Sequence, residues 1–173
     1  MSRVRRPRLF LVTAAFLVSA GALLANVQIR DAGSKIRGDA YSRSSTRTMR
    51  HSRDVSRDFR NYAQRSRRNS QPVAPTIARA HVNELAQNVK LTQTYLAEEK
   101  KEFAGDKKAL ASLDKVEKQV QVEAKQQAAL AELVKGDKID VDAVVKACED
   151  AEEAIDKAVA EHDEMVEAAA GAS

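Results

Sequence analysis

Two side chains in this sequence have the chemistry of soft metal ligands: His81 and the single cysteine, Cys148. Imidazole and thiolate suit Zn, Cu or Ni. If the helices predicted below pair antiparallel about their two turns, His81 and Cys148 fall in one layer. Glu84, Glu123 or Glu152 would then lie about one turn away as third ligands. The pattern therefore predicts a small metal-binding sensor or carrier as one alternative for the function.

The same side chains also fit structural roles. A histidine in a helix seam often fixes the register, and a lone cysteine is often a buried small hydrophobic side chain or forms a disulfide between chains. The sequence has no C-x-x-C pair, and His162 lies roughly 21 Å from Cys148 along one helix. For His162 we expect a hydrogen bond with Tyr95. The main prediction is that the protein holds no cofactor.

No pattern typical of an enzyme is present. The sequence lacks a Ser-His-Asp or Cys-His signature and a glycine-rich phosphate loop after a strand, and no strand is predicted. We therefore predict a protein that is not an enzyme and has no small-molecule substrate.

The charge of the chain is divided between its two parts. Residues 1–75 hold 16 Lys and Arg against 4 Asp and no Glu, for a net charge of +12. Residues 76–173 hold 13 Lys and Arg against 21 Asp and Glu, for a net charge of −8. Such a division predicts two segments with different physical roles.

Residues 1–25 have the pattern of an export signal. Four arginines precede an uncharged apolar run over residues 9–25, and Ala20-Gly21-Ala22 is typical of a cleavage site. The alternative is an uncleaved anchor in the inner membrane, since 17 residues lie at the short end of what spans a bilayer. Both readings predict an exported protein that is periplasmic or otherwise outside the cytoplasm.

Residues 26–75 are rich in Arg and Ser and poor in large apolar side chains, so we expect a disordered basic linker. A weak helical period over 41–67 runs through Tyr41, Ser45, Ser52 and Phe59 among others. It predicts an amphipathic helix that forms on binding, or a fourth helix that completes the body. The basic segment could also fold back on the acidic body.

The arginines off that period predict adhesion to an anionic membrane or envelope polymer. Nucleic-acid binding through the same segment is the other alternative, and export makes it the weaker one. The predicted anionic-surface residues are Arg43, Arg47, Arg50, Arg57, Arg60 and Arg68.

From residue 76 onward the apolar residues follow a helical period, which predicts helices over 76–104, 106–134 and 140–169 and a tail over 170–173. Thr76, Asp106 and Asp140 are expected N-caps. Equal lengths and short turns favour an antiparallel three-helix bundle. Because its core is thin, we expect a homo-oligomer or completion by a fourth helix. The predicted function is an all-α, exported or membrane-anchored interaction or spacer module.

Overall fold

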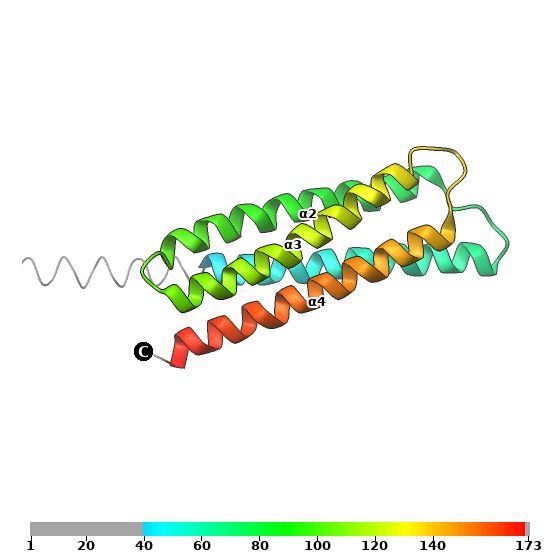
Figure 1. Ribbon diagram of the computed structural model, residues 1–173. Coiled ribbons are helices and arrows are strands. Elements are labelled where there is room, and N and C mark those ends of the chain that lie inside the picture. Colours follow the sequence, from blue (N-terminus) through cyan, green and yellow to red (C-terminus); the bar gives the residue numbers. More distant parts are fainter. Residues whose placement is uncertain (1–39, 172–173) are drawn as a thin grey trace, which may run out of the picture. The chain divides into compact units, whose positions relative to one another are not determined.

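The computed structural model describes residues 40–171, with side chains as far as residue 169. These residues form a four-helix bundle without strands, so the prediction of a helical bundle is confirmed and a fourth helix is added to it (Figure 1). The predicted signal or anchor over residues 1–25 lies outside the described residues, as does the first part of the predicted linker. None of the helices in residues 40–171 has the length and apolar character needed to cross a membrane.

Three of the helices follow the apolar periods of the sequence. They are α2 (Pro75–Glu102), α3 (Lys107–Leu133) and α4 (Val141–Gly171). Asp106 accepts hydrogen bonds from the backbone of Lys108 and Ala109, and Asp140 accepts one from Ala143, so both cap the helices that follow them.

The expected cap at Thr76 is wrong. The N-cap of α2 is Ala74, which makes no side-chain capping bond, and Pro75 opens the helix. Proline suits the first position of a helix because its φ is already helical and it has no N–H to leave unpaired.

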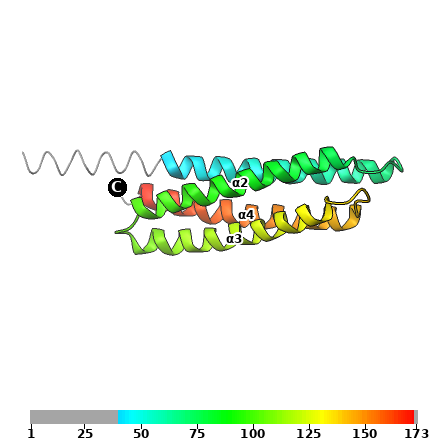
Figure 2. The ribbon, with the colours of Figure 1, turned by 90° about the horizontal axis from the view of Figure 1, so that it is seen from above.

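The fourth helix covers residues 40–68, where the sequence predicted a disordered linker. Figures 1 and 2 together place it beside both α2 and α4. The expectation of disorder does not hold here because the inward side of this helix buries apolar side chains such as Phe59 and Met49, with small serines between them that permit close packing of helices. Its buried residues are Ser42, Ser45, Met49, Ser52, Val55, Ser56, Phe59, Ala63 and Ser66.

Helix 40–68 ends in a Schellman motif. The N–H of Gln71 bonds to the carbonyl of Ser66 at 2.9 Å, and the N–H of Ser70 bonds to that of Arg67 at 3.1 Å. Ser70 adopts the left-handed conformation this motif requires, with φ at 52°. The Tyr62 hydroxyl then accepts the N–H of Ala74 at 2.9 Å, which ties the connection to α2 back onto the helix.

The apolar core consists of two clusters, one nearer each end of the bundle. Phe59, Leu85 and Leu130 belong to one cluster, and Met49, Leu113 and Ile155 belong to the other. Buried polar residues occupy the positions between the clusters on three helices, and we call them the polar waist. The residues of the polar waist are Ser52, Asn88, Thr92 and Glu123.

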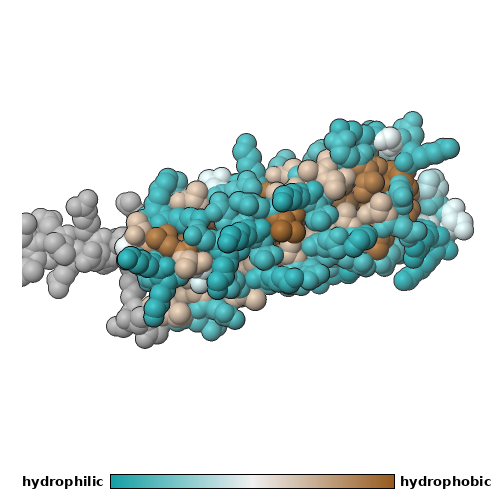
Figure 3. All heavy atoms as spheres, in the orientation of Figure 1, coloured by the Kyte–Doolittle hydropathy of each residue, from teal (hydrophilic) through white to brown (hydrophobic). Residues whose placement is uncertain are grey.

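The bundle surface is mainly hydrophilic on the face shown in Figure 3, where apolar residues form separate small patches. The large apolar side chains that are most exposed are Ile77, Leu91, Val122 and Val166, at 36–45%. They are distributed over three helices, so homo-oligomer formation stays a prediction without an assigned face.

Candidate functional site

The first candidate site is a buried cluster around Glu99 of α2 and His162 of α4, both 0% exposed. The Nε2 atom of His162 lies 2.9 and 3.0 Å from the two carboxyl oxygens of Glu99. Helix 40–68 adds three hydroxyls: Ser42 and Ser45 donate to the Glu99 carboxylate, and Thr46 Oγ1 lies 3.1 Å from His162 Nδ1. We call these five residues the Glu99 cluster. It satisfies a fully buried carboxyl group with partners from two other helices.

The order of groups in the Glu99 cluster is hydroxyl, imidazole, carboxylate, as in hydrolases that use a nucleophile and a base. Thr46, however, lies inside a helix, where neighbouring backbone N–H groups already donate to helix carbonyls. An oxyanion site of backbone amides therefore does not form beside it. The cluster is a hydrogen-bond network that joins helix 40–68, α2 and α4.

The hydrogen bond predicted between Tyr95 and His162 is wrong. The imidazole bonds to Glu99 and Thr46 instead. A buried carboxylate is a stronger acceptor than a phenol, and α2 places Glu99 one turn beyond Tyr95 on the buried side of the helix.

Glu123 is the second unusual carboxyl group. Its side chain is 1% exposed within the polar waist, and within residues 40–169 neither carboxyl oxygen makes a hydrogen bond of normal geometry. Burial raises the pKa of Glu123 to about 7, while the nearby Ser52 hydroxyl opposes the rise. Glu123 therefore takes up or releases a proton near neutral pH inside the core.

Cys148 is a buried free thiol, 0% exposed, on α4. Burial raises the pKa of its thiol to about 12, and the neighbouring Glu152 adds to the rise. The Glu152 carboxylate is bonded to Arg60 of helix 40–68 at 3.3 Å. A thiol that stays protonated at neutral pH is a poor nucleophile and a poor metal ligand.

The remaining predicted ligands lie in separate surroundings. His81 stacks on the ring of Phe59, with centroids 5.2 Å apart and planes at 14°, and Glu84 bonds to His51 at 3.0 Å. Within residues 40–169, no group of three or more His, Cys, Asp or Glu side chains is arranged to hold a metal ion. Of the predicted set, the structure places Glu152 beside Cys148, and the metal alternative stays a prediction.

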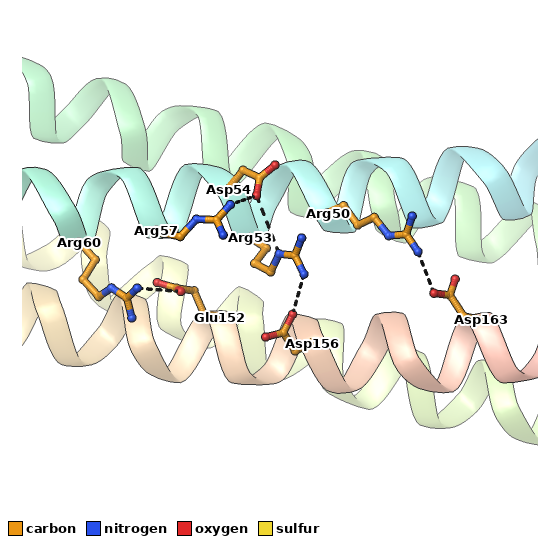
Figure 4. A network of polar contacts seen from close by, with 8 residues as sticks. All are labelled: Arg50, Arg53, Asp54, Arg57, Arg60, Glu152, Asp156 and Asp163. Atoms are coloured by element: carbon orange, nitrogen blue, oxygen red, sulfur yellow. Dashed lines mark hydrogen bonds and ion pairs between the residues drawn. The ribbon is translucent and has the colours of Figure 1, made fainter.

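Four arginines on one flank of helix 40–68 bind carboxylates of α4. Figure 4 shows the pairs of Arg50, Arg53 and Arg60. The pairs are Arg50–Asp163 at 2.8 Å, Arg53–Asp156 at 3.1 Å, Arg60–Glu152 at 3.3 Å and Arg67–Asp142. Arg53, Arg60 and Arg67 are seven residues apart, which keeps them on one flank over successive pairs of turns. We call all four arginines the α4-facing row. The acidic body thus neutralises part of the basic segment, as the fold-back alternative anticipated.

The outward side of the same helix carries a different set of arginines. Four are exposed and have no carboxylate partner among the described residues, and we call them the arginine face. They are Arg43, Arg47, Arg65 and Arg68. Of the six predicted surface arginines, Arg43, Arg47 and Arg68 belong to this face. Arg57 binds Asp54 of its own helix, and Arg50 and Arg60 belong to the α4-facing row.

Residue types taken one at a time do not predict the Glu99 cluster. Glu99 and His162 both interrupt predicted apolar stripes, and a carboxylate and an imidazole in facing seams are natural partners. That complementarity was the available signal. The serines gave none, since serine is also typical of linkers.

The chain matches no family model, and no curated protein or solved structure is significantly similar to it.

Proposed function

We propose that this protein is an exported or membrane-anchored, non-enzymatic interaction module whose arginine face adheres to an anionic envelope component. The observation that carries the proposal is the unequal use of arginines on helix 40–68: one flank is neutralised by α4, while Arg43, Arg47, Arg65 and Arg68 are exposed without a carboxylate partner in the described part.

The arrangement of these four arginines supports a flat anionic partner. Their spacing of 4, 18 and 3 residues keeps them on one side of a helix, over roughly 37 Å at 1.5 Å per residue. The buried seam lies on the opposite side, so the arginine face can approach a surface without disturbing the core.

The expected strength of this adhesion is modest. At about 1 kcal/mol for each arginine near anionic lipid, four contribute about 4 kcal/mol, equivalent to a dissociation constant on the order of 1 mM in accessible lipid. Stable attachment needs a second contact. The apolar segment over residues 9–25, if it is retained as an anchor, would provide that contact.

Vesicle binding tests the adhesion. Residues 38–173 form a compact unit with its own core, and their cooperative melting is verified first. We expect binding to vesicles that contain phosphatidylglycerol, weaker binding at high salt, and no binding to phosphatidylcholine vesicles.

The decisive variant changes Arg43, Arg47, Arg65 and Arg68 to Gln. Its control changes four exposed lysines to Gln, for the same change in net charge; they form no ion pair with the residues that the structure describes. These lysines are Lys107, Lys118, Lys125 and Lys138. Equal binding by the two variants would reject the arginine face as the adhesive surface.

N-terminal sequencing of the mature protein, with fractionation of the cells, tests the location. A chain that begins near residue 23 and is released in soluble form indicates cleavage, whereas an intact N-terminus in the membrane fraction indicates an anchor. An intact chain in the cytoplasm would contradict both forms of the proposal.

A further inference from the structure

We propose that a groove between helix 40–68 and the C-terminal part of α4 is a binding site for a phosphate group. The groove has a volume of about 710 Å³, within the range of ligand sites. The residues of its wall that matter here are Ser42, Arg43, Thr46, Arg47, Arg50 and Asp163. The inference deepens the proposed function, on which it rests for the biological context, by naming the chemical group recognised at one end of the arginine face.

Two guanidinium groups in the groove are available to a ligand. Arg43 and Arg47 are four residues apart on one helix, which places their Cβ atoms roughly 6 Å from each other. Neither has a carboxylate partner within residues 40–169. Two planar guanidinium forks at this spacing suit the tetrahedral oxygens of one phosphate group, which accepts paired hydrogen bonds from arginine.

The two acidic residues in the groove are already paired. Asp163 binds Arg50 at 2.8 Å, and Asp54 binds Arg57. Arg43 and Arg47 therefore supply the charge that a ligand meets. These two arginines match the charge of one phosphate group, so the site is proposed for a single phosphate group.

The backbone that carries these arginines is held firmly from inside. Ser42 and Thr46, each next to one of the arginines in sequence, are bonded to Glu99 and His162 of the Glu99 cluster. Anchoring both turns of the helix positions Arg43 and Arg47 before a ligand arrives. A preorganised site loses less conformational entropy on binding than a mobile loop does.

Calorimetric titration of the full-length chain, held in phosphatidylcholine nanodiscs at low salt, tests the site. The probes are inorganic phosphate and glycerophosphoglycerol, the soluble headgroup of phosphatidylglycerol. We expect saturable binding of one phosphate group per chain, weakened about tenfold by Arg43→Gln or by Arg47→Gln. Lys125→Gln, an exposed residue of α3 outside the arginine face, makes the same change in charge, is the control and should leave the affinity unchanged.

The two probes separate the possible sources of the ligand. Tighter binding of inorganic phosphate assigns the site to a free phosphate dianion, and tighter binding of glycerophosphoglycerol assigns it to a lipid headgroup. The proposal that the groove binds phosphate is overturned if neither probe binds. It is also overturned if Arg43→Gln, Arg47→Gln and the control bind equally well. Vesicle adhesion that depends on Arg65 and Arg68 alone would overturn it while leaving the proposed function intact.

Because Arg43 and Arg47 are exposed and have no carboxylate partner in the described part, their glutamine variants should fold normally. Unchanged melting of the variants establishes that a lost affinity reflects lost contacts.

Discussion

The two sides of helix 40–68 both carry arginines, but in different surroundings. On the side toward α4, arginines are partly buried or bonded to carboxylates, as Arg60 is at 24% side-chain exposure. On the outward side, Arg43, Arg47, Arg65 and Arg68 face solvent. The difference shows that the positive charge of this segment is divided: one part pairs the helix with carboxylates of α4, and the other is exposed.

The inward side depends most on the Glu99 cluster. Replacing His162 by Leu leaves the buried Glu99 carboxyl group with hydroxyl partners alone, and we expect a loss of about 3 kcal/mol in the free energy of unfolding. Urea unfolding followed by circular dichroism measures it. The double variant, Glu99→Leu with His162→Leu, should recover most of the loss because no buried polar group is left unpaired. A double variant no more stable than the single one would contradict this account.

Glu123 of the polar waist should make the free energy of unfolding depend on pH. The pKa of Glu123 is about 7 in the folded protein and 4.5 in an ordinary environment, so the folded state binds the proton more tightly than the unfolded state does. The resulting stability is complete below about pH 4.5 and is lost as the pH rises through about 7, by about 3 kcal/mol in all.

Glu123→Gln is neutral at every pH, so its stability relative to the wild type should increase over that interval. Denaturant unfolding at a series of pH values measures the difference, with Glu167→Gln, exposed near the end of α4, as the control. A parallel pH dependence in wild type and Glu123→Gln would exclude this titration.

Replacing an arginine should lower the free energy of unfolding more on the side toward α4 than on the outward side. Arg60→Gln leaves Glu152, whose side chain is 14% exposed, without its cation, and we expect a loss of about 1 kcal/mol. Arg65→Gln on the outward side should change stability by less than about 0.5 kcal/mol. Thermal melts of both variants at low and high salt compare them directly. Similar losses would show that the two sides do not differ in this way.

The smallest expected effect concerns the end of the helix. Ser70 has a φ of 52°, which favours glycine because a Cβ atom is crowded in the left-handed region. Ser70→Gly should stabilise the protein by about 0.5 kcal/mol, and Ser70→Val should destabilise it by more. Chemical denaturation resolves both, and a more stable Val variant would contradict the assigned cap.

The bounds of α2, α3 and α4 could be predicted from the sequence within two residues. Pro75, Gly105 and Asp140 mark helix ends by local chemistry, and Val, Leu and Ala recur between them at a helical period. Those signals act within a few residues of the chain, so no knowledge of the tertiary fold is needed to interpret them.

Helix 40–68 could not be predicted with the same certainty. Ser42, Ser45 and Ser56 are small enough to pack against a neighbouring helix, but by type they indicate a linker as readily as a seam. The high density of Arg also suggested repulsion and disorder. That repulsion is relieved by carboxylates of α4 about 100 residues away, as in Arg53–Asp156, and local patterns do not report such partners.

The seven-residue repeat of Arg53, Arg60 and Arg67 has a consequence for how the helix finds its place. If helix 40–68 slipped two turns along α4, Arg53 would meet Asp163, Arg60 would meet Asp156 and Arg67 would meet Glu149, so opposite charges would coincide again. Long-range electrostatic attraction alone thus brings the helix to α4 without selecting one of the two alignments. The buried Glu99 carboxylate accepts hydrogen bonds from Ser42 and Ser45 in only one alignment, and these bonds therefore select it.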